Sequence, residues 1–300
     1  MRTPRKRESS QGLQRFESSL LRQINYMRNA PDSILIYLCK KYNSFFKTPN
    51  PEQKEIFNAL NVKKDNNLHH KLLLEYQMKK AQGLLKNFPI LKVDIAQKKV
   101  LDYGCSNGGI SIAMHELYPE AVYGIDINRN GILHAQEEVK NRAISNIFFI
   151  AYEGRKIPFE NEFFDTIIMY DVIEHLQNPS DNLLELKRVL KKTGQIYITT
   201  FPWYHPHGVH LWNVFPAPWT HLIFPERIVT QVRCGMPKKY GDLGLNKMTV
   251  RKLHKLLEKT GFSIDFEEYK TKKFLMPFKK IPFINEFIIS LVLLKISKRD

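Results

Sequence analysis

The sequence has 300 residues, of which 43% are hydrophobic, 12% aromatic and 25% charged. This composition excludes a globally disordered chain, and the length suits one α/β domain with additions. The three cysteines are scattered without a C-x-x-C spacing, which argues against a disulfide framework or a thiolate zinc site. We interpret the net charge of +16 mainly as compositional bias, leaving nucleic acid and an anionic membrane or substrate as alternatives.

Residues 1–97 are predicted to form a basic N-terminal tail and a helical extension. Apolar residues recur at helical spacing in 33–46 and 72–85, with a loop rich in Pro, Asn and Lys between them. The basic start is followed by no apolar segment, and the apolar run 287–294 has eight residues, too few to span a bilayer. We therefore expect a cytoplasmic protein, with peripheral membrane contact as an open alternative.

From Lys98 onward, strands alternate with helices, which is the pattern of a parallel sheet. The expected strands are 99–103, 121–126, 147–152, 164–170 and 195–200, and the expected helices are 109–118, 129–143 and 182–191. The alternation stops over 201–246, which is rich in Trp, His and Pro, and resumes with a helix at 249–260 and a strand at 263–269. Segment 287–296 is predicted to close the sheet as a strand, with an apolar helix as the alternative.

The first expected strand runs into a glycine turn that begins at Gly104 and is followed by a helix. Such a turn lets the backbone approach a ligand closely, and the helix N-terminus offers N–H groups. Ser106 occupies the second glycine position of the dinucleotide fingerprint, so a dinucleotide is disfavoured. Asp102 precedes the turn, where a carboxylate would repel a pyrophosphate and attract the ammonium group of an amino-acid ligand.

Asp126 ends the second expected strand, 24 residues beyond Asp102. An acid at this place can accept hydrogen bonds from both hydroxyls of a ribose. Taken with the glycine turn, it predicts a ligand that contains both adenosine and an ammonium group.

The segment Val100–Asn128 resembles the first motifs of the class I S-adenosylmethionine-dependent methyltransferases, and the likeness extends over residues 98–200. The resemblance implies a Rossmann-like, doubly wound α/β fold with a mostly parallel seven-stranded sheet whose last strand is antiparallel. It places a methyltransferase domain at 98–300, with 201–246 as an insertion after the fifth strand on the acceptor side. It also implies S-adenosyl-L-methionine as cofactor and S-adenosyl-L-homocysteine as product.

The resemblance also assigns donor-binding roles. Glu153 matches the acidic position that contacts the adenine amino group, although aspartate is commoner there. The segment 170–176 matches the end of the fourth strand beside the methyl donor. The predicted donor site consists of Asp102, Gly104, Ser106, Gly108, Asp126, Ile127, Glu153, Gly154 and Tyr170.

Methyl transfer from a sulfonium requires alignment of the acceptor and, where needed, removal of its proton, so no covalent nucleophile is required. His175, His210 and His221 are candidate bases, with loop ordering or packing as their alternative roles. No metal site is predicted, because no carboxylate or thiolate closely accompanies the histidines of 201–226. The sequence contains neither the Pro-Cys pair nor the Asp/Asn-Pro-Pro-aromatic motif of nucleic-acid base methylation, which makes a nucleic-acid partner the less favoured alternative.

The segment 201–226 resembles a "type 11" branch of methyltransferases related to the O-methyltransferases of ubiquinone biosynthesis. This resemblance implies a small-molecule acceptor, and we expect methylation of a hydroxyl on a lipid, quinone or sugar-type compound. Two alternatives stay open: an RNA methyltransferase, suggested by the basic charge, and a non-catalytic S-adenosylmethionine-binding regulatory module.

Overall fold

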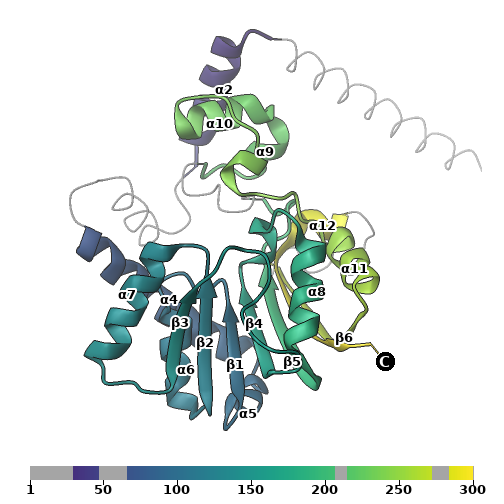
Figure 1. The fold of residues 1–300 in the computed structure, drawn as a ribbon. Coiled ribbons are helices and arrows are strands. Elements are labelled where there is room, and N and C mark those ends of the chain that lie inside the picture. Colours follow the sequence, from purple (N-terminus) through teal and green to yellow (C-terminus); the bar gives the residue numbers. More distant parts are fainter. Residues whose placement is uncertain (1–29, 47–65, 207–214, 272–283, 300) are drawn as a thin grey trace, which may run out of the picture. The chain divides into compact units, whose positions relative to one another are not determined.

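The structure is a computed structural model that describes residues 30–46, 66–206, 215–271 and 284–299 (Figure 1). The chain divides into two compact units, which we call unit 1 (residues 1–49 and 206–243) and unit 2 (residues 50–205 and 244–300). This division crosses the boundary predicted at residue 97. The second half of the helical extension belongs to unit 2, and most of segment 201–246 joins the N-terminal helix in unit 1.

Unit 2 contains a seven-stranded sheet in the order β3-β2-β1-β4-β5-β7-β6. The strands are β1 (Lys99–Tyr103), β2 (Ala121–Asp126), β3 (Ile147–Ala151), β4 (Phe164–Tyr170), β5 (Leu190–Thr200), β6 (Phe262–Thr271) and β7 (Ile289–Lys298). Strands β1 to β5 pair in parallel, and β7 runs antiparallel to both β5 and β6. The predicted doubly wound, mostly parallel sheet is confirmed, and the segment near the C-terminus is a strand.

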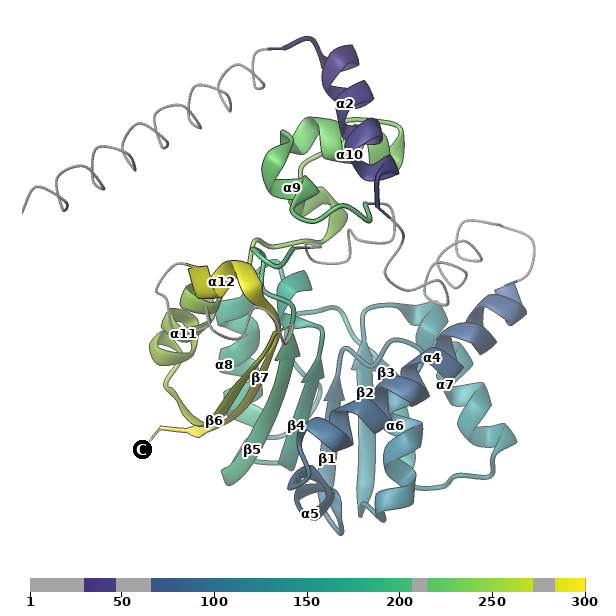
Figure 2. The ribbon, with the colours of Figure 1, turned by 180° about the vertical axis from the view of Figure 1, so that it is seen from behind.

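Helices cover both faces of this sheet, as Figures 1 and 2 show from opposite sides. They are α4 (Asn66–Asn87), α5 (Leu91–Ile95), α6 (Gly109–Met114), α7 (Arg129–Asn141), α8 (Pro179–Val189), α11 (Val250–Lys259) and α12 (Ile284–Ile288), with 3-10 turns η1 (His115–Leu117) and η2 (Ile173–His175). Two of the helices have an N-cap side chain. Asn128 accepts a hydrogen bond from the Gly131 N–H of α7, and Thr249 accepts one from the Lys252 N–H of α11.

Successive side chains of β1 point to opposite faces of the sheet and therefore enter different cores. Val100 packs in the cluster that contains apolar residues of α4, α5, α6 and α7. Leu101 and Tyr103 pack in the cluster formed with α8 and α11. Each fully buried side chain of this size contributes about 1.5–3 kcal/mol to stability, so the two apolar layers hold the strand ends in place.

The predicted boundary between the helix at 182–191 and the strand at 195–200 was wrong: the helix ends two residues earlier and the strand begins five residues earlier. Helix α8 ends at Val189, and β5 already begins at Leu190, which pairs with Phe164 of β4. A Cβ at position 194 would lie 2.5 Å from Leu190 Cδ1. Glycine at this position therefore leaves room for the Leu190 side chain where the strand begins. The polar run Lys191–Gly194 concealed the first part of the strand.

The connection from β3 to β4, residues 152–163, contains no helix. Aromatic side chains pack there instead: the Tyr123 ring centroid lies 5.3 Å from Phe148 and 5.0 Å from Phe159. Lys99 adds a cation–π contact, with its Nζ 4.9 Å from the centroid of Phe163. The aromatic rings thus supply apolar packing at the β2–β3 side of the sheet.

In its described residues, unit 1 contains α2 (Asp32–Ser44), α9 (Thr220–Ile223), α10 (Glu226–Cys234) and the 3-10 turn η3 (Gly241–Leu243). Asn43 joins its two chain segments: the side-chain oxygen accepts from the Ala217 N–H at 3.1 Å and the Thr220 hydroxyl at 3.3 Å. Burial raises the pKa of the Cys39 thiol to about 12, so this side chain packs as a neutral group. Among the described helices of both units, none is long and apolar enough to cross a membrane.

Candidate donor and acceptor site

The carboxyl ends of β1, β2, β3 and β4 meet at one edge of the sheet, because these strands are parallel neighbours. The strand order reverses between β1 and β4, which makes this edge the topological switch point where open α/β sheets bind ligands. Asp102 lies next to the end of β1, Asp126 ends β2 and Tyr170 ends β4. The fold therefore brings the described donor-site residues predicted from separate motifs to one edge.

Two positions of the glycine turn have a backbone conformation that only glycine adopts without strain. Gly104 and Gly108 have φ of +80° and +78°. A Cβ on Gly104 would lie 2.6 Å from Val172 Cγ2, so the turn and the loop after β4 approach each other closely. The N–H groups of Gly104 and Cys105 both donate to the Ile125 carbonyl, at 2.9 and 3.1 Å, which ties the turn to β2.

Asp126 connects the glycine turn to the loop after β2. Its Oδ2 accepts from the Ser106 N–H and its Oδ1 accepts from the Asn128 N–H, both at 2.8 Å. Each carboxylate oxygen can accept a second hydrogen bond, so Asp126 can hold the turn and two ribose hydroxyls at once.

The strand ends beside Asp126 bring the remaining predicted adenosine contacts together. Ile127 is 69% exposed, and a Cβ on Gly154 would lie 3.4 Å from Ile127 Cγ2. Glu153, also exposed, precedes Gly154 in the same loop. An exposed aliphatic side chain next to a carboxylate suits a purine, which needs an apolar wall and a partner for its amino group.

Asp102 is 1% exposed, and its Oδ2 accepts from the Ser111 hydroxyl of α6 at 2.6 Å. The pKa of Asp102 is raised to about 6, mainly by burial and also by the nearby charge of Asp126, while the hydrogen bond from Ser111 acts in the opposite direction. Two carboxylates so close that the charge of Asp126 raises the pKa of Asp102 favour a ligand with a positive charge. S-adenosylmethionine carries an ammonium and a sulfonium group, so these residues fit that cofactor.

The raised pKa of Asp102 predicts a pH-dependent affinity for the donor. An ammonium ligand binds the ionised carboxylate, so the affinity is full above the pKa of about 6 and falls as the pH drops through it. We expect up to ~10-fold weaker binding per pH unit below that value. Titration calorimetry from pH 7.5 to 5 measures this slope, and Asp102→Asn should flatten it. An unchanged slope in that variant would contradict the assignment.

Helix α4 contributes residues that the sequence did not single out. The Gln77 side chain accepts from the Gly109 N–H at the start of α6, at 3.1 Å. Lys80 Nζ lies 2.8 Å from Asp171 Oδ2. The same nitrogen lies 5.0 Å from the ring centroid of Tyr170 and 5.1 Å from the ring centroid of Tyr76. The extension is therefore part of the site, with an ion pair next to the end of β4.

The Lys80–Asp171 pair is largely buried, with side-chain exposures of 22% and 5%. Burial would lower the pKa of Lys80, but the Asp171 carboxylate raises it on balance. Asp171 also accepts from the Thr199 hydroxyl at 3.0 Å. The ammonium group therefore stays charged and is oriented by its carboxylate partner.

Removal of one member of this pair is expected to destabilise unit 2. Lys80→Met keeps the aliphatic stem but leaves Asp171 buried without its cation, which should cost about 2–3 kcal/mol in the free energy of unfolding. The double variant Lys80→Met/Asp171→Asn should recover at least ~1 kcal/mol of that loss. Urea unfolding of the unchanged protein, the single variants Lys80→Met and Asp171→Asn, and the double variant measures the coupling. Strictly additive losses would show that the pair does not act as a unit.

The structure describes two of the three candidate bases, His175 in unit 2 and His221 in unit 1. His175 Nδ1 lies 2.8 Å from the Gly244 carbonyl, which can only accept, so Nδ1 carries a proton and Nε2 is the basic nitrogen of the neutral ring. His221 is buried in α9 of unit 1, whereas the donor residues belong to unit 2. His210 lies outside the described residues. Within the described part of the chain, no three His, Cys, Asp or Glu side chains form a group that could hold a metal ion.

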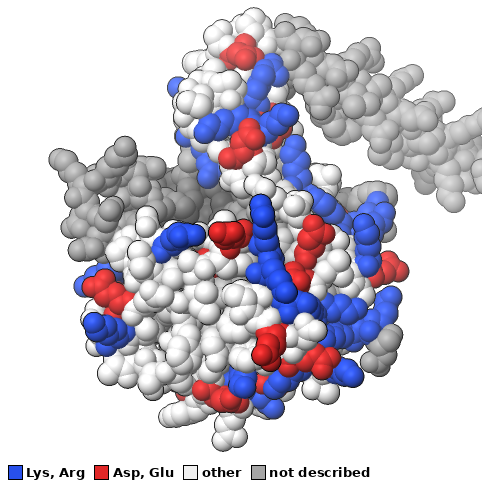
Figure 3. All heavy atoms as spheres, in the orientation of Figure 1, with Lys and Arg blue, Asp and Glu red and all other residues white. Residues whose placement is uncertain are grey.

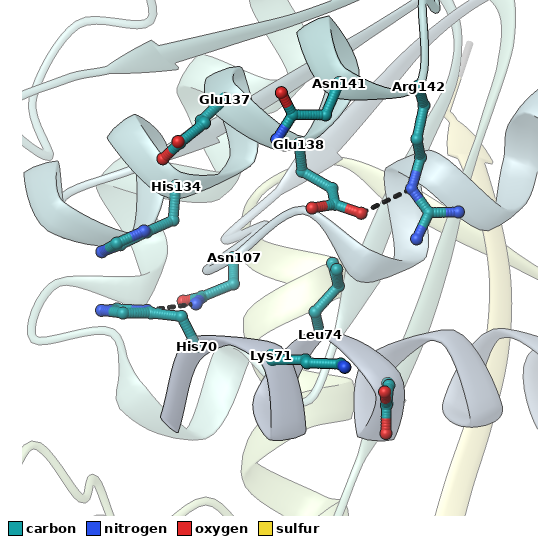
Figure 4. Close-up of a pocket in the computed structure, with 10 residues that line it drawn as sticks. His70, Lys71, Leu74, Asn107, His134, Glu137, Glu138, Asn141 and Arg142 are labelled. Atoms are coloured by element: carbon teal, nitrogen blue, oxygen red, sulfur yellow. Dashed lines mark hydrogen bonds and ion pairs between the residues drawn. The ribbon is translucent and has the colours of Figure 1, made fainter. Parts of the chain in front are cut away.

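A polar pocket of about 290 Å³ lies on the outer side of the glycine turn, between α4 and α7 (Figure 4). The His70 and His134 rings stack there with centroids 3.4 Å apart, and Asn107 Nδ2 lies 2.7 Å from His70 Nδ1. Asn107 is buried within the turn, so these contacts connect α4 directly to the donor loop.

The fold and the site define an adenosine-binding α/β protein of the class I methyltransferase type. A family model described as a methyltransferase domain matches residues 95–261. The chain belongs to this methyltransferase family, and S-adenosylmethionine is its cofactor, as predicted.

Several curated proteins share this region. An uncharacterized methyltransferase of Schizosaccharomyces pombe is 32% identical over 105 residues, which is 33% of this chain and 38% of that protein. A tRNA U34 carboxymethyltransferase of Campylobacter fetus is 33% identical over 36% of this chain and 38% of its own length. A phthiotriol/phenolphthiotriol dimycocerosates methyltransferase of Mycobacterium ulcerans is 30% identical over 36% and 39%. The matches thus span less than two-fifths of these relatives.

Solved structures share the fold. An S-adenosylmethionine-dependent methyltransferase from Methanosarcina mazei superposes with a TM-score of 0.50 at 21% identity, covering 71% of this chain and 98% of that protein. The PH0226 protein of Pyrococcus horikoshii gives a TM-score of 0.50 at 21% identity, over 78% and 93% of the two chains.

Proposed function

We propose that the protein transfers a methyl group from S-adenosylmethionine to a hydroxyl group of a small lipid, quinone or sugar-type acceptor. The observation that carries this proposal is the pair of carboxylates, Asp102 and Asp126, around the glycine turn at the switch point of the sheet. The Lys80–Asp171 pair lies at the neighbouring strand end. A relative named for phthiotriol, a triol, supports a hydroxyl acceptor.

The chain's own residues have separate tasks in this proposal. S-adenosylmethionine, when bound, supplies a methyl group already activated by its sulfonium. The carboxylate of Asp126 would accept hydrogen bonds from the ribose hydroxyls, and that of Glu153 would accept one from the adenine amino group. The carboxylate of Asp102 would neutralise the ammonium group. His175, oriented through Nδ1 by the Gly244 carbonyl, takes the proton of the acceptor hydroxyl at Nε2.

An RNA acceptor is the second candidate, because several relatives are tRNA U34 carboxymethyltransferases. Figure 3 shows Lys and Arg side chains, with Asp and Glu side chains among them, over the half of unit 2 that carries α8 and α11, whereas the half with β2 and β3 is mostly uncharged. A phosphate backbone would bind such a basic surface with a strong salt dependence.

The test is methyl transfer from labelled S-adenosylmethionine to a cell extract separated into lipid, RNA, protein and small-molecule fractions. We expect label in the lipid or small-molecule fraction, and its loss with Asp126→Ala. Label confined to RNA would replace the proposal with the second candidate. Binding of the donor without any transfer would indicate a non-catalytic module.

A further inference from the structure

The outward face of α2 carries a row of apolar side chains that we call the α2 stripe. Its members are Ile34, Tyr37 and Leu38 of the helix and Phe45 at its C-cap, which are 50%, 61%, 39% and 73% exposed. Spacings of three, four and seven residues place them, with Lys41, along one side of a helix. Exposed apolar groups gathered in this way mark an interaction surface more often than scattered ones do.

The stripe is not needed to hold unit 1 together. The opposite side of α2 does that, through buried Leu35, Cys39 and Asn43. The Tyr42 hydroxyl adds a hydrogen bond to the Pro218 carbonyl at 2.9 Å, and its ring centroid lies 6.0 Å from that of Phe224. Helix α2 is therefore apolar on two sides, of which one is already packed within the unit.

Charge around the stripe points to the kind of partner. Lys41 Nζ lies 5.8 Å from the centroid of the Tyr37 ring, so its aliphatic stem covers part of the stripe. Long basic side chains of this kind keep their charged end in the polar layer while their stems lie on apolar surface. Over its described residues, unit 1 carries six basic and three acidic side chains, and the basic ones include adjacent Lys40 and Lys41.

Apolar and basic groups on one helix are the combination that binds an anionic lipid surface. A nucleic acid would use the basic charge but would gain little from the aliphatic Ile34 and Leu38. A purely apolar protein groove would bury the stripe but would not require the basic excess. We propose that unit 1 docks on an anionic lipid bilayer through the α2 stripe, with Lys40 and Lys41 at the headgroups.

The test is co-sedimentation of the full-length protein with vesicles of phosphatidylcholine and phosphatidylglycerol, with pure phosphatidylcholine vesicles as the neutral comparison. We expect binding to the anionic vesicles, and at least ~10-fold weaker binding by Tyr37→Ser/Phe45→Ser. The matched control is Tyr118→Ser/Leu133→Ser, which removes two large apolar side chains of 81% and 61% exposure from unit 2. This control should bind as the unchanged protein does.

Equal binding by the two double variants would overturn the proposal, as would the absence of binding to anionic vesicles. Unchanged circular dichroism and melting temperature of the stripe variant would show that a loss of binding is not a loss of folding. A lipid partner would also be contradicted if neither the unchanged protein nor the stripe variant bound vesicles, while the stripe variant lost binding to an RNA oligonucleotide. No donor is present in this assay, so its outcome is independent of the proposed methyl transfer.

Discussion

Replacement of Asp126 by alanine is expected to weaken binding of S-adenosylmethionine by at least ~100-fold. The carboxylate is the proposed partner of two ribose hydroxyls, and each hydrogen bond to a charged group contributes about 1.5–3 kcal/mol. Asp126 also receives the N–H groups of Ser106 and Asn128, so its loss frees the turn that surrounds the donor. Isothermal titration calorimetry with S-adenosylhomocysteine measures the change.

Asp265→Ala provides the control for this substitution. Asp265 lies in β6 and accepts from the Ser297 hydroxyl at 2.9 Å, so its removal also takes a hydrogen-bonded carboxylate from the sheet. We expect its donor affinity to stay within ~2-fold of the unchanged protein. If both variants lost affinity alike, a general loss of structure would explain the result and Asp126 would have no special role.

Gly108→Ala is expected to destabilise unit 2 by about 3 kcal/mol, since two costs combine there. Its φ of +78° is unfavourable for any residue with a Cβ, and that Cβ would lie 2.4 Å from Phe149 Cζ and 2.9 Å from Ala135 Cβ. Neither neighbour can withdraw easily, because Phe149 is buried in β3 and Ala135 in α7. Urea unfolding monitored by circular dichroism gives the loss.

Gly244→Ala separates the two costs. Gly244 has a φ of +69°, yet nothing lies within 4 Å of a Cβ built on it. This variant should lose only about 1 kcal/mol, the cost of the backbone conformation alone. Equal losses for Gly108→Ala and Gly244→Ala would show that the close packing of the turn against β3 and α7 does not contribute.

The sequence predicted the order of strands and helices in unit 2 because each strand carries a short apolar run bounded by turns. The same pattern placed Asp102 and Asp126 at the ends of two strands, where the structure has them, while their roles in binding the donor stay a prediction. The start of β5 was missed because the run Lys191–Gly194 is polar. The strand residues on either side of it, Leu190 and Gln195, pair with β4 across a register shift that the sequence does not reveal.

Contacts between distant segments could not be read from local patterns. Lys80 and Asp171 are 91 residues apart, and nothing in helix α4 marks that lysine as the partner of a strand-end carboxylate. Tyr42 and Pro218 are 176 residues apart, so the joining of α2 to the segment after β5 was equally hidden. Helical periodicity gives the apolar side of an element but not the element that covers it.

The most direct measurement is titration calorimetry of the unchanged protein with S-adenosylmethionine and S-adenosylhomocysteine. The site predicts one donor molecule per chain, with affinity lost in Asp126→Ala and retained in Asp265→Ala. Absence of binding of either compound to the unchanged, folded protein would contradict a functional donor site around Asp102 and Asp126.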